Sequence, residues 1–134
     1  MPTSTVKYLG ALRTECLHQK SGNTFITDAP VDNNGKGEAF SPTDTVATAL
    51  GSCMLTVMGI KARDMAVDLT GAIASIEKVM ASAPRRISEI KVVVDIPVKP
   101  SDKDQKILEH TARTCPVLMS IHPEIKKDIT FHWG

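Results

Sequence analysis

The sequence feature that most constrains the fold is an uncharged segment from Thr45 to Ile60. A strong helix start precedes it. Ser41 can act as the N-cap, Pro42 suits the first helical position, and Asp44 stands where a capping box needs its acceptor. We predict a helix that runs to about Asp64. The uncharged segment is too short to span a bilayer and contains several Thr, Gly and Ser residues, so we predict an internal helix rather than a membrane helix.

The apolar residues of this helix are not confined to one stripe. Two faces are apolar, one made by Val46, Leu50, Cys53 and Val57 and the other by Ala47, Met54 and Met58. A helix that is apolar all round must be covered all round, and a chain of 134 residues has limited material for this. We therefore predict that a second copy covers part of it, in a symmetric dimer. The alternative is a helix wrapped by its own sheet, with its small residues facing solvent.

The rest of the chain alternates between extended and helical patterns. Alternating apolar residues and turn signals predict strands, while a cap residue followed by helical periodicity predicts helices. The predicted strands are Val6–Gln19, Thr24–Thr27, Leu69–Met80, Ile90–Ile96 and a last one containing Ile129, Phe131 and Trp133; the predicted helices follow Ser101 and begin at Pro116. This order of hairpin, helix, hairpin, helix pair and strand predicts one α+β domain over residues 1–134.

Composition excludes several functional classes. The apolar content of 42% supports a real core, and the formal net charge is only +1, with scattered lysines and arginines. We therefore expect no nucleic-acid partner and no membrane partner. The N-terminus lacks the pattern of a secretory signal, and three cysteines are too few for a secreted disulfide scaffold. We expect a cytoplasmic protein without a metal, since the histidines form no ligand motif.

Two cysteines carry the chemical information. Cys53 lies in the middle of the uncharged helix, and Cys115 directly precedes Pro116, where it can cap a short helix. Such a pair suggests peroxide reduction, in which the first thiol attacks and the second closes a disulfide. The alternative is that both are packing residues, because free cysteine often behaves as a small buried hydrophobe. Cys16 is interpreted as structural or incidental.

A nucleophilic Cys53 needs a cation nearby. A free thiol is mostly protonated at neutral pH, and Cys53 is about three turns from the helix start, whereas the helix dipole acts within the first turn. Our preferred cation is Arg13, in an otherwise neutral part of the first strand. A solvated strand arginine is the alternative for this residue.

Two short motifs resemble a known family. Ser41-Pro42-Thr43-Asp44-Thr45, with the small residues that lead into Ser52-Cys53-Met54, is similar to the reactive helix of the osmotically inducible protein C and organic hydroperoxide resistance (OsmC/Ohr) family. Thr114-Cys115-Pro116-Val117 is similar to that family's Cys-Pro-Val segment. The separation of the two cysteines and the order of elements also fit, so the resemblance covers essentially the whole chain.

The resemblance implies an OsmC-like α+β fold, with antiparallel sheets around a long central helix in an intertwined homodimer. It implies a thiol-dependent reductase of organic hydroperoxides that needs no cofactor. Cys53 would be the peroxidatic thiol, Cys115 the resolving thiol and Arg13 the group that holds the thiolate. A dithiol reductant, such as a lipoylated protein, would restore the thiols.

The chain departs from the family pattern at one position. Such enzymes usually have a glutamate directly after the helix-start proline, and this chain has Thr43. Asp44 follows but has a capping role, while Glu38 could approach the site from the preceding loop. We therefore interpret the chain as a divergent member, with Thr43, Asp44 and Glu38 as supporting residues.

The substrate side of the site is predicted from Met54 and Met58, whose side chains would line a hydrophobic pocket for organic peroxides. The alternative is that these methionines fill the core. Two other functions stay open on the same fold: non-catalytic binding of a small hydrophobic ligand, which the missing glutamate favours, and redox sensing.

Overall fold

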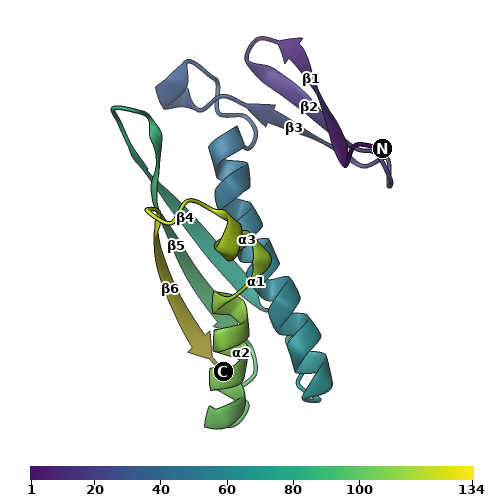
Figure 1. Ribbon diagram of the computed structural model, residues 1–134, viewed down its shortest axis with the longest axis vertical. Coiled ribbons are helices and arrows are strands. Elements are labelled where there is room, and N and C mark those ends of the chain that lie inside the picture. The colour runs from purple at the N-terminus through teal and green to yellow at the C-terminus, as the bar shows by residue number, and fades with distance from the viewer. The chain divides into compact units, whose positions relative to one another are not determined.

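The computed structural model describes residues 1–134. The chain divides into two compact units, residues 1–46 and residues 47–134, and each is described by itself (Figure 1). The long helix α1, Pro42–Asp64, begins in the first unit and continues through the second. The α+β class predicted from the sequence is confirmed.

The first unit is built on a three-stranded sheet. Strands β1 (Ser4–Gly10), β2 (Arg13–His18) and β3 (Thr24–Asp28) are antiparallel and lie in the order β1-β2-β3. A single 3₁₀ turn, η1 (Val31–Asn33), lies in the loop that leads to α1.

The prediction of one long strand over Val6–Gln19 is wrong. The chain reverses between β1 and β2, where Gly10, Ala11 and Leu12 all have positive φ, at 87°, 54° and 63°. A two-residue hairpin turn needs this left-handed backbone, and it is usually marked by Asn, Asp or Gly. Ala11 and Leu12 carry no such mark, so the turn was hidden within an apparently continuous strand pattern.

The first unit contains no fully buried apolar side chain. Its buried residues are all polar: Thr27, Asp28 and Ser41. Large apolar side chains are exposed instead, among them Val6, Tyr8, Leu9, Leu12, Phe25, Val31 and Phe40. A three-stranded sheet of this kind has little hydrophobic stabilisation of its own.

Helix α1 begins with the predicted capping box. The Asp44 backbone N–H donates to Ser41 Oγ at 3.0 Å, and the Ser41 backbone N–H donates to the Asp44 carboxylate at 3.0 Å. These reciprocal bonds satisfy two donors that the first turn would otherwise leave free. Pro42 takes the first helical position, where it loses no intrahelical hydrogen bond.

The second unit contains a mixed sheet. Strands β4 (Ile73–Ala81) and β5 (Arg86–Ile96) form an antiparallel pair, and β6 (Lys126–Trp133) adds to β5 in parallel. The expectation of antiparallel sheets therefore does not extend to β6. Two helices, α2 (Asp102–Arg113) and α3 (Pro116–Ser120), connect β5 to β6, and a crossover of this kind is what parallel neighbours require.

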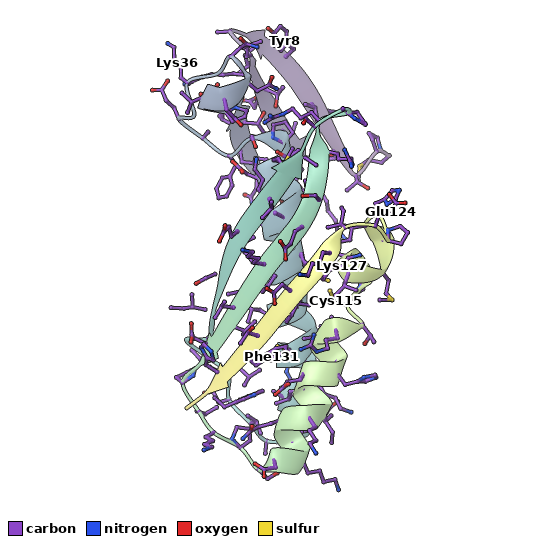
Figure 2. The ribbon with its side chains drawn as sticks, turned by 90° about the vertical axis from the view of Figure 1, so that its left-hand side faces the viewer. Tyr8, Lys36, Cys115, Glu124, Lys127 and Phe131 are labelled. Atoms are coloured by element: carbon purple, nitrogen blue, oxygen red, sulfur yellow. The ribbon has the colours of Figure 1, made fainter.

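The core of the second unit lies between the sheet and its helices. Alternate residues of β5 face inward and are fully or almost fully buried: Ile90, Val92, Val94 and Ile96. Helices α1, α2 and α3 lie on the same side of the sheet (Figures 1 and 2). Helices α1 and α2 contribute Leu50, Met54, Met58, Leu108 and Ala112 to the same core cluster, and Val117 and Leu118 of α3 pack against it.

Helix α1 is long and apolar enough, by length and composition alone, to cross a membrane. In the second unit, however, one of its faces packs in the core through Leu50, Met54, Met58 and Ala62. Its other apolar face stays open in the single chain: Cys53 and Val57 are half-buried, and Ile60 is exposed. The sequence prediction that one chain cannot cover the whole helix agrees with this burial.

Close approach of α1 to the sheet depends on Gly51. A Cβ atom at this position would lie 2.6 Å from Ile76 Cδ1 of β4 and 3.4 Å from the Ala74 Cβ. Because glycine has no Cβ atom, this clash does not arise, and the helix backbone can lie close to the strand.

Candidate functional site

The buried thiol of Cys115 caps helix α3. Its backbone has the extended conformation of an N-cap residue, and Pro116 follows at the first helical position. The Leu118 backbone N–H donates to Cys115 Sγ at 3.4 Å. The predicted capping role is therefore present, with sulfur in the place that a serine oxygen usually takes. Figure 2 shows Cys115 at the junction between α2 and α3.

Cys53 and Cys115 are neighbours within the second unit. Both are free thiols; Cys115 is buried and Cys53 is half-buried on α1. Burial raises the pKa of Cys115, and the adjacent Cys53 thiol raises it further through a hydrogen bond and through its charge. The backbone N–H groups of Leu118 and Val117 lower this pKa, but burial outweighs them. Cys115 therefore stays protonated at neutral pH.

This arrangement has a chemical consequence. When two coupled thiols share a site, the one that keeps its proton can stabilise the thiolate of the other. A protonated Cys115 beside Cys53 would favour the thiolate form of Cys53.

Arg13 is organised within the first unit by two carboxylates. Its Nη2 donates to Glu38 at 2.6 Å and lies 3.4 Å from the Asp28 carboxylate. The Arg13 side chain is 35% exposed, whereas the Asp28 side chain is 1% exposed. Arg13 is therefore held in ion pairs and is not merely a solvated strand arginine.

The supporting residues fall into two groups. Asp44 is committed to the capping box with Ser41, and the Thr43 hydroxyl lies 3.2 Å from the Ser41 hydroxyl. Glu38, by contrast, reaches Arg13 from the loop before α1.

The two methionines predicted to line a substrate pocket are fully buried. Met54 and Met58 have no exposed surface and belong to the core cluster. Their burial favours the alternative interpretation, in which they fill the core. Cys16 lies on β2, opposite Val6 and Phe25 in the neighbouring strands, and its sulfur is 3.9 Å from the Thr14 hydroxyl.

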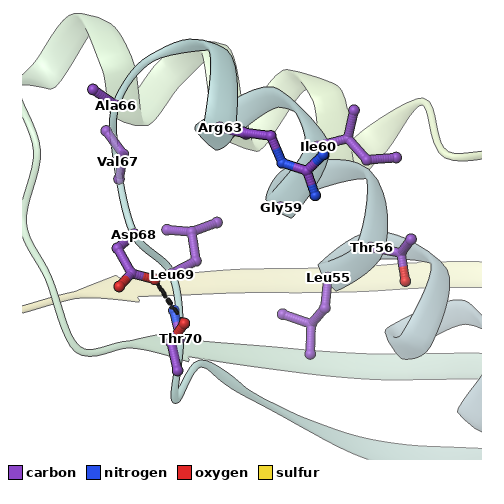
Figure 3. A pocket seen from close by; sticks show the side chains of 10 residues that line it. All are labelled: Leu55, Thr56, Gly59, Ile60, Arg63, Ala66, Val67, Asp68, Leu69 and Thr70. Atoms are coloured by element: carbon purple, nitrogen blue, oxygen red, sulfur yellow. Dashed lines mark hydrogen bonds between the residues drawn. The ribbon is translucent and has the colours of Figure 1, made fainter.

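A separate hollow of about 680 Å³ lies beside the C-terminal half of α1 (Figure 3). Its apolar wall consists of Leu55, Ile60, Ala66, Val67 and Leu69, and its polar residues include Thr56, Arg63, Asp68 and Thr70. The Asp68 carboxylate accepts hydrogen bonds from the Thr70 backbone at 2.9 Å and from its hydroxyl at 2.7 Å. These bonds lower the pKa of Asp68, so the hollow contains one fixed negative charge as well as the Arg63 guanidinium.

The OsmC-like protein family matches residues 35–130 of this chain. The chain belongs to the OsmC-like family. The match begins within the loop before α1 and includes both Cys53 and Cys115. The family resemblance inferred from the two cysteine motifs is confirmed.

Solved structures extend the comparison over nearly the whole chain. A Psychrobacter arcticus 273-4 protein, provisionally assigned to osmotic stress and detoxification responses, is 56% identical, with a TM-score of 0.96 over 98% of this chain and 96% of that one. An organic hydroperoxide resistance protein OsmC from Legionella pneumophila is 15% identical (TM-score 0.76; 98% and 97% covered). An OsmC-like protein from Mycoplasma pneumoniae is 12% identical (TM-score 0.80; 97% and 94% covered). No curated protein matches the sequence.

The sequence did not predict one polar residue of this OsmC-like protein, Asp28, as part of the site. Asp28 ends β3 and gave no motif, because an isolated aspartate at a strand end resembles an ordinary turn signal. Its side chain is nevertheless buried and lies against Arg13. The β2–β3 register of the structure pairs Arg13 directly with Asp28. The sequence could not predict this register while the β1–β2 turn was missed.

Proposed function

We propose that this OsmC-like protein is a cysteine-dependent peroxidase that reduces organic hydroperoxides. The observation that carries the proposal is the pair of free, neighbouring thiols, one half-buried on α1 and the other buried at the start of α3. Relatives of the same fold are named as organic hydroperoxide resistance proteins, which supports this choice of substrate class.

The proposed cycle has three balanced steps. The Cys53 thiolate attacks the distal oxygen of ROOH, the O–O bond breaks, and ROH leaves after its alkoxide takes up a proton. Cys53 is then a sulfenic acid. The Cys115 sulfur attacks the Cys53 sulfur, and water leaves as the disulfide forms. An external dithiol reduces the disulfide by exchange, becomes oxidised itself, and restores both thiols.

The proposal assigns Arg13 to the electrostatic part of this cycle. Its guanidinium would stabilise the Cys53 thiolate and the developing alkoxide. Its ion pairs with Glu38 and Asp28 support a role that needs a fixed cation. Glu38 would then supply the carboxylate that Thr43 cannot.

The wider context is also part of the proposal. Residues 1–134 act as a single OsmC-like domain in an intertwined homodimer, in the cytoplasm, where a dithiol reductant such as a lipoylated protein is available. The exposed apolar side chains of the first unit and of α1 support a second copy as their cover. The chemistry requires no metal and no organic cofactor.

The decisive experiment is a thiol titration before and after one equivalent of cumene hydroperoxide. The peroxidase proposal expects rapid loss of two thiols per chain and a Cys53–Cys115 disulfide in the peptide mass map. Cys53→Ser should abolish peroxide consumption, and Cys115→Ser should consume one equivalent and trap a sulfenic acid on Cys53. Cys16→Ser is the matched control and should behave as the wild type. Slow oxidation spread over all three cysteines would overturn the proposal.

The hollow in Figure 3 favours one second candidate, a protein that binds a small amphipathic ligand without catalysis. Its volume lies within the range of ordinary ligand sites. This candidate predicts a ligand that co-purifies with the protein, together with slow and unselective thiol oxidation. A redox sensor would instead form the disulfide quickly but show little turnover with any dithiol.

A further inference from the structure

Asp28 occupies an unusual position for a charged residue. Its side chain is almost completely buried in a unit that has no buried apolar residue. It lies directly across the β2–β3 ladder from Arg13, and its backbone N–H donates to the Phe40 carbonyl at 3.0 Å. Its backbone is therefore fixed on both sides, by a strand and by the segment that leads into α1.

One oxygen of Asp28 fixes two groups at once. Oδ2 lies 3.4 Å from Arg13 Nη2 and also accepts the Glu38 backbone N–H at 3.0 Å. The second carboxylate of the cluster, Glu38, is thus held at its backbone by the first. Its own side chain is 58% exposed, so by itself it would be a mobile partner for the guanidinium.

The other oxygen of Asp28 makes the arrangement costly. Oδ1 is buried and has no hydrogen-bond partner. A buried carboxylate with an unsatisfied oxygen destabilises a fold, and an apolar residue would usually serve stability better. Stability alone therefore does not account for Asp28 at this position.

We propose that Asp28 is a positioning residue, which holds the Arg13 guanidinium in one orientation while Glu38 completes the cluster from outside. The inference rests on the proposed function of Arg13 as the cation that stabilises the Cys53 thiolate. Asp28 acts through Arg13 and makes no contact with peroxide. The exposed Glu38 contributes less, because water can replace part of its interaction.

The test measures the rate at which iodoacetamide alkylates Cys53 between pH 5 and pH 10, with the modified residue identified by peptide mass mapping. The sign of the change in this rate distinguishes two effects. Removal of a negative charge near Arg13 would, by charge alone, favour the thiolate and speed alkylation. Loss of positioning has the opposite sign. We therefore expect Asp28→Asn to slow Cys53 alkylation at pH 7 by about 10-fold and move the profile to higher pH, and to slow peroxide reduction by up to about 100-fold.

Matched variants separate the causes. Glu15→Gln removes one negative charge from β2 and should leave the profile unchanged or make alkylation slightly faster. Glu38→Gln should have a smaller effect than Asp28→Asn. In an Arg13→Ala background, Asp28→Asn should cause no further loss. Faster alkylation in Asp28→Asn, or a full additional loss in the Arg13→Ala background, would overturn the inference.

A further measurement uses the wild-type protein, so its result does not depend on whether a variant folds. The NMR order parameter of the Arg13 Nε–Hε group should be high, while that of the exposed Arg63, whose guanidinium has no hydrogen bond or ion pair, should be low. Equal mobility would overturn the positioning role. If Arg13→Ala leaves Cys53 alkylation unchanged, the proposed function of Arg13 fails as well; if only Asp28→Asn leaves it unchanged, the positioning role fails alone.

Discussion

Among the single residues, Cys115 has the clearest pH signature. Burial and the neighbouring Cys53 raise its pKa in the folded chain. The unfolded chain releases this proton near the ordinary thiol pKa of about 8.5, while the folded chain keeps it. The contribution of Cys115 to the free energy of unfolding is therefore complete below about pH 8.5 and declines as the pH rises toward the folded pKa.

We expect urea unfolding of the fully reduced protein to show this decline between pH 8 and 10. Other groups also titrate there, so the comparison is with Cys115→Ser, in which the thiol is absent and serine retains an acceptor for the Leu118 backbone N–H. The difference in unfolding free energy between the two proteins should shrink as the pH rises. A difference that is constant, or that grows, would contradict the assigned direction.

Local signals explain which residues the sequence could predict. Cys115 was recognisable as a helix cap because Pro116 follows it, and the Ser41–Asp44 box is visible within four consecutive letters. The placement of Asp28 beside Arg13 and Glu38 depends on a strand register and on a loop that folds back onto it. Neither feature gives a recognisable sequence pattern near residue 28. The proximity of the two thiols could not be derived from their spacing, because it arises from tertiary packing; it was suggested by the positions of the two cysteines in their helices and by the family resemblance.

At the level of elements, the start of α1 depends on its capping box. Ser41 is buried and accepts the Asp44 backbone N–H through its hydroxyl. We expect Ser41→Ala to lower the free energy of unfolding by about 1 kcal/mol, as measured by urea denaturation. Ser41→Asp, which keeps an acceptor at the N-cap, should lose less stability than the alanine variant. An alanine variant as stable as the wild type would show that the box adds nothing to α1.

The contact between α1 and β4 gives a second prediction for the elements. Gly51→Ala would gain about 1 kcal/mol of helix propensity, but its Cβ would lie 2.6 Å from Ile76 Cδ1. Overpacking in cores costs about 1–3 kcal/mol, so we expect net destabilisation in thermal unfolding. Ile76→Val removes the clashing methyl group, and the double variant should recover stability relative to Gly51→Ala. Additive losses in the double variant would exclude this contact as the cause.

The prediction of helices and strands failed where it depended on an unusual turn or on the direction of a neighbouring strand. The helices α1, α2 and α3 were predicted correctly because their caps are marked by Ser41, Ser101 and Cys115-Pro116. The β1–β2 turn was missed because Ala11 and Leu12 are not residues that favour a left-handed backbone. The parallel placement of β6 could not be derived either, since alternation along a strand indicates which face is buried but not the direction of its neighbour.

For the whole molecule, the distribution of burial predicts association. The first unit exposes Val6, Tyr8 and Phe25 and buries only polar residues, and α1 leaves Ile60 exposed. If a second copy covers these surfaces, the species in solution should have twice the 14.5 kDa mass of one chain by sedimentation equilibrium. Its unfolding midpoint should rise with protein concentration, because folding and association are then linked. A monomer with a concentration-independent midpoint would contradict the proposed homodimer.

The lack of an apolar interior in residues 1–46 also bears on biosynthesis. These residues leave the ribosome before residues 47–134, at a time when that later part of the chain is not yet available. With only Thr27, Asp28 and Ser41 withdrawn from water, the nascent segment has too little to bury for a lasting structure. Stable folding of its three strands therefore depends on chain that is synthesised later, and until then Tyr8 and Phe25 remain exposed apolar surface.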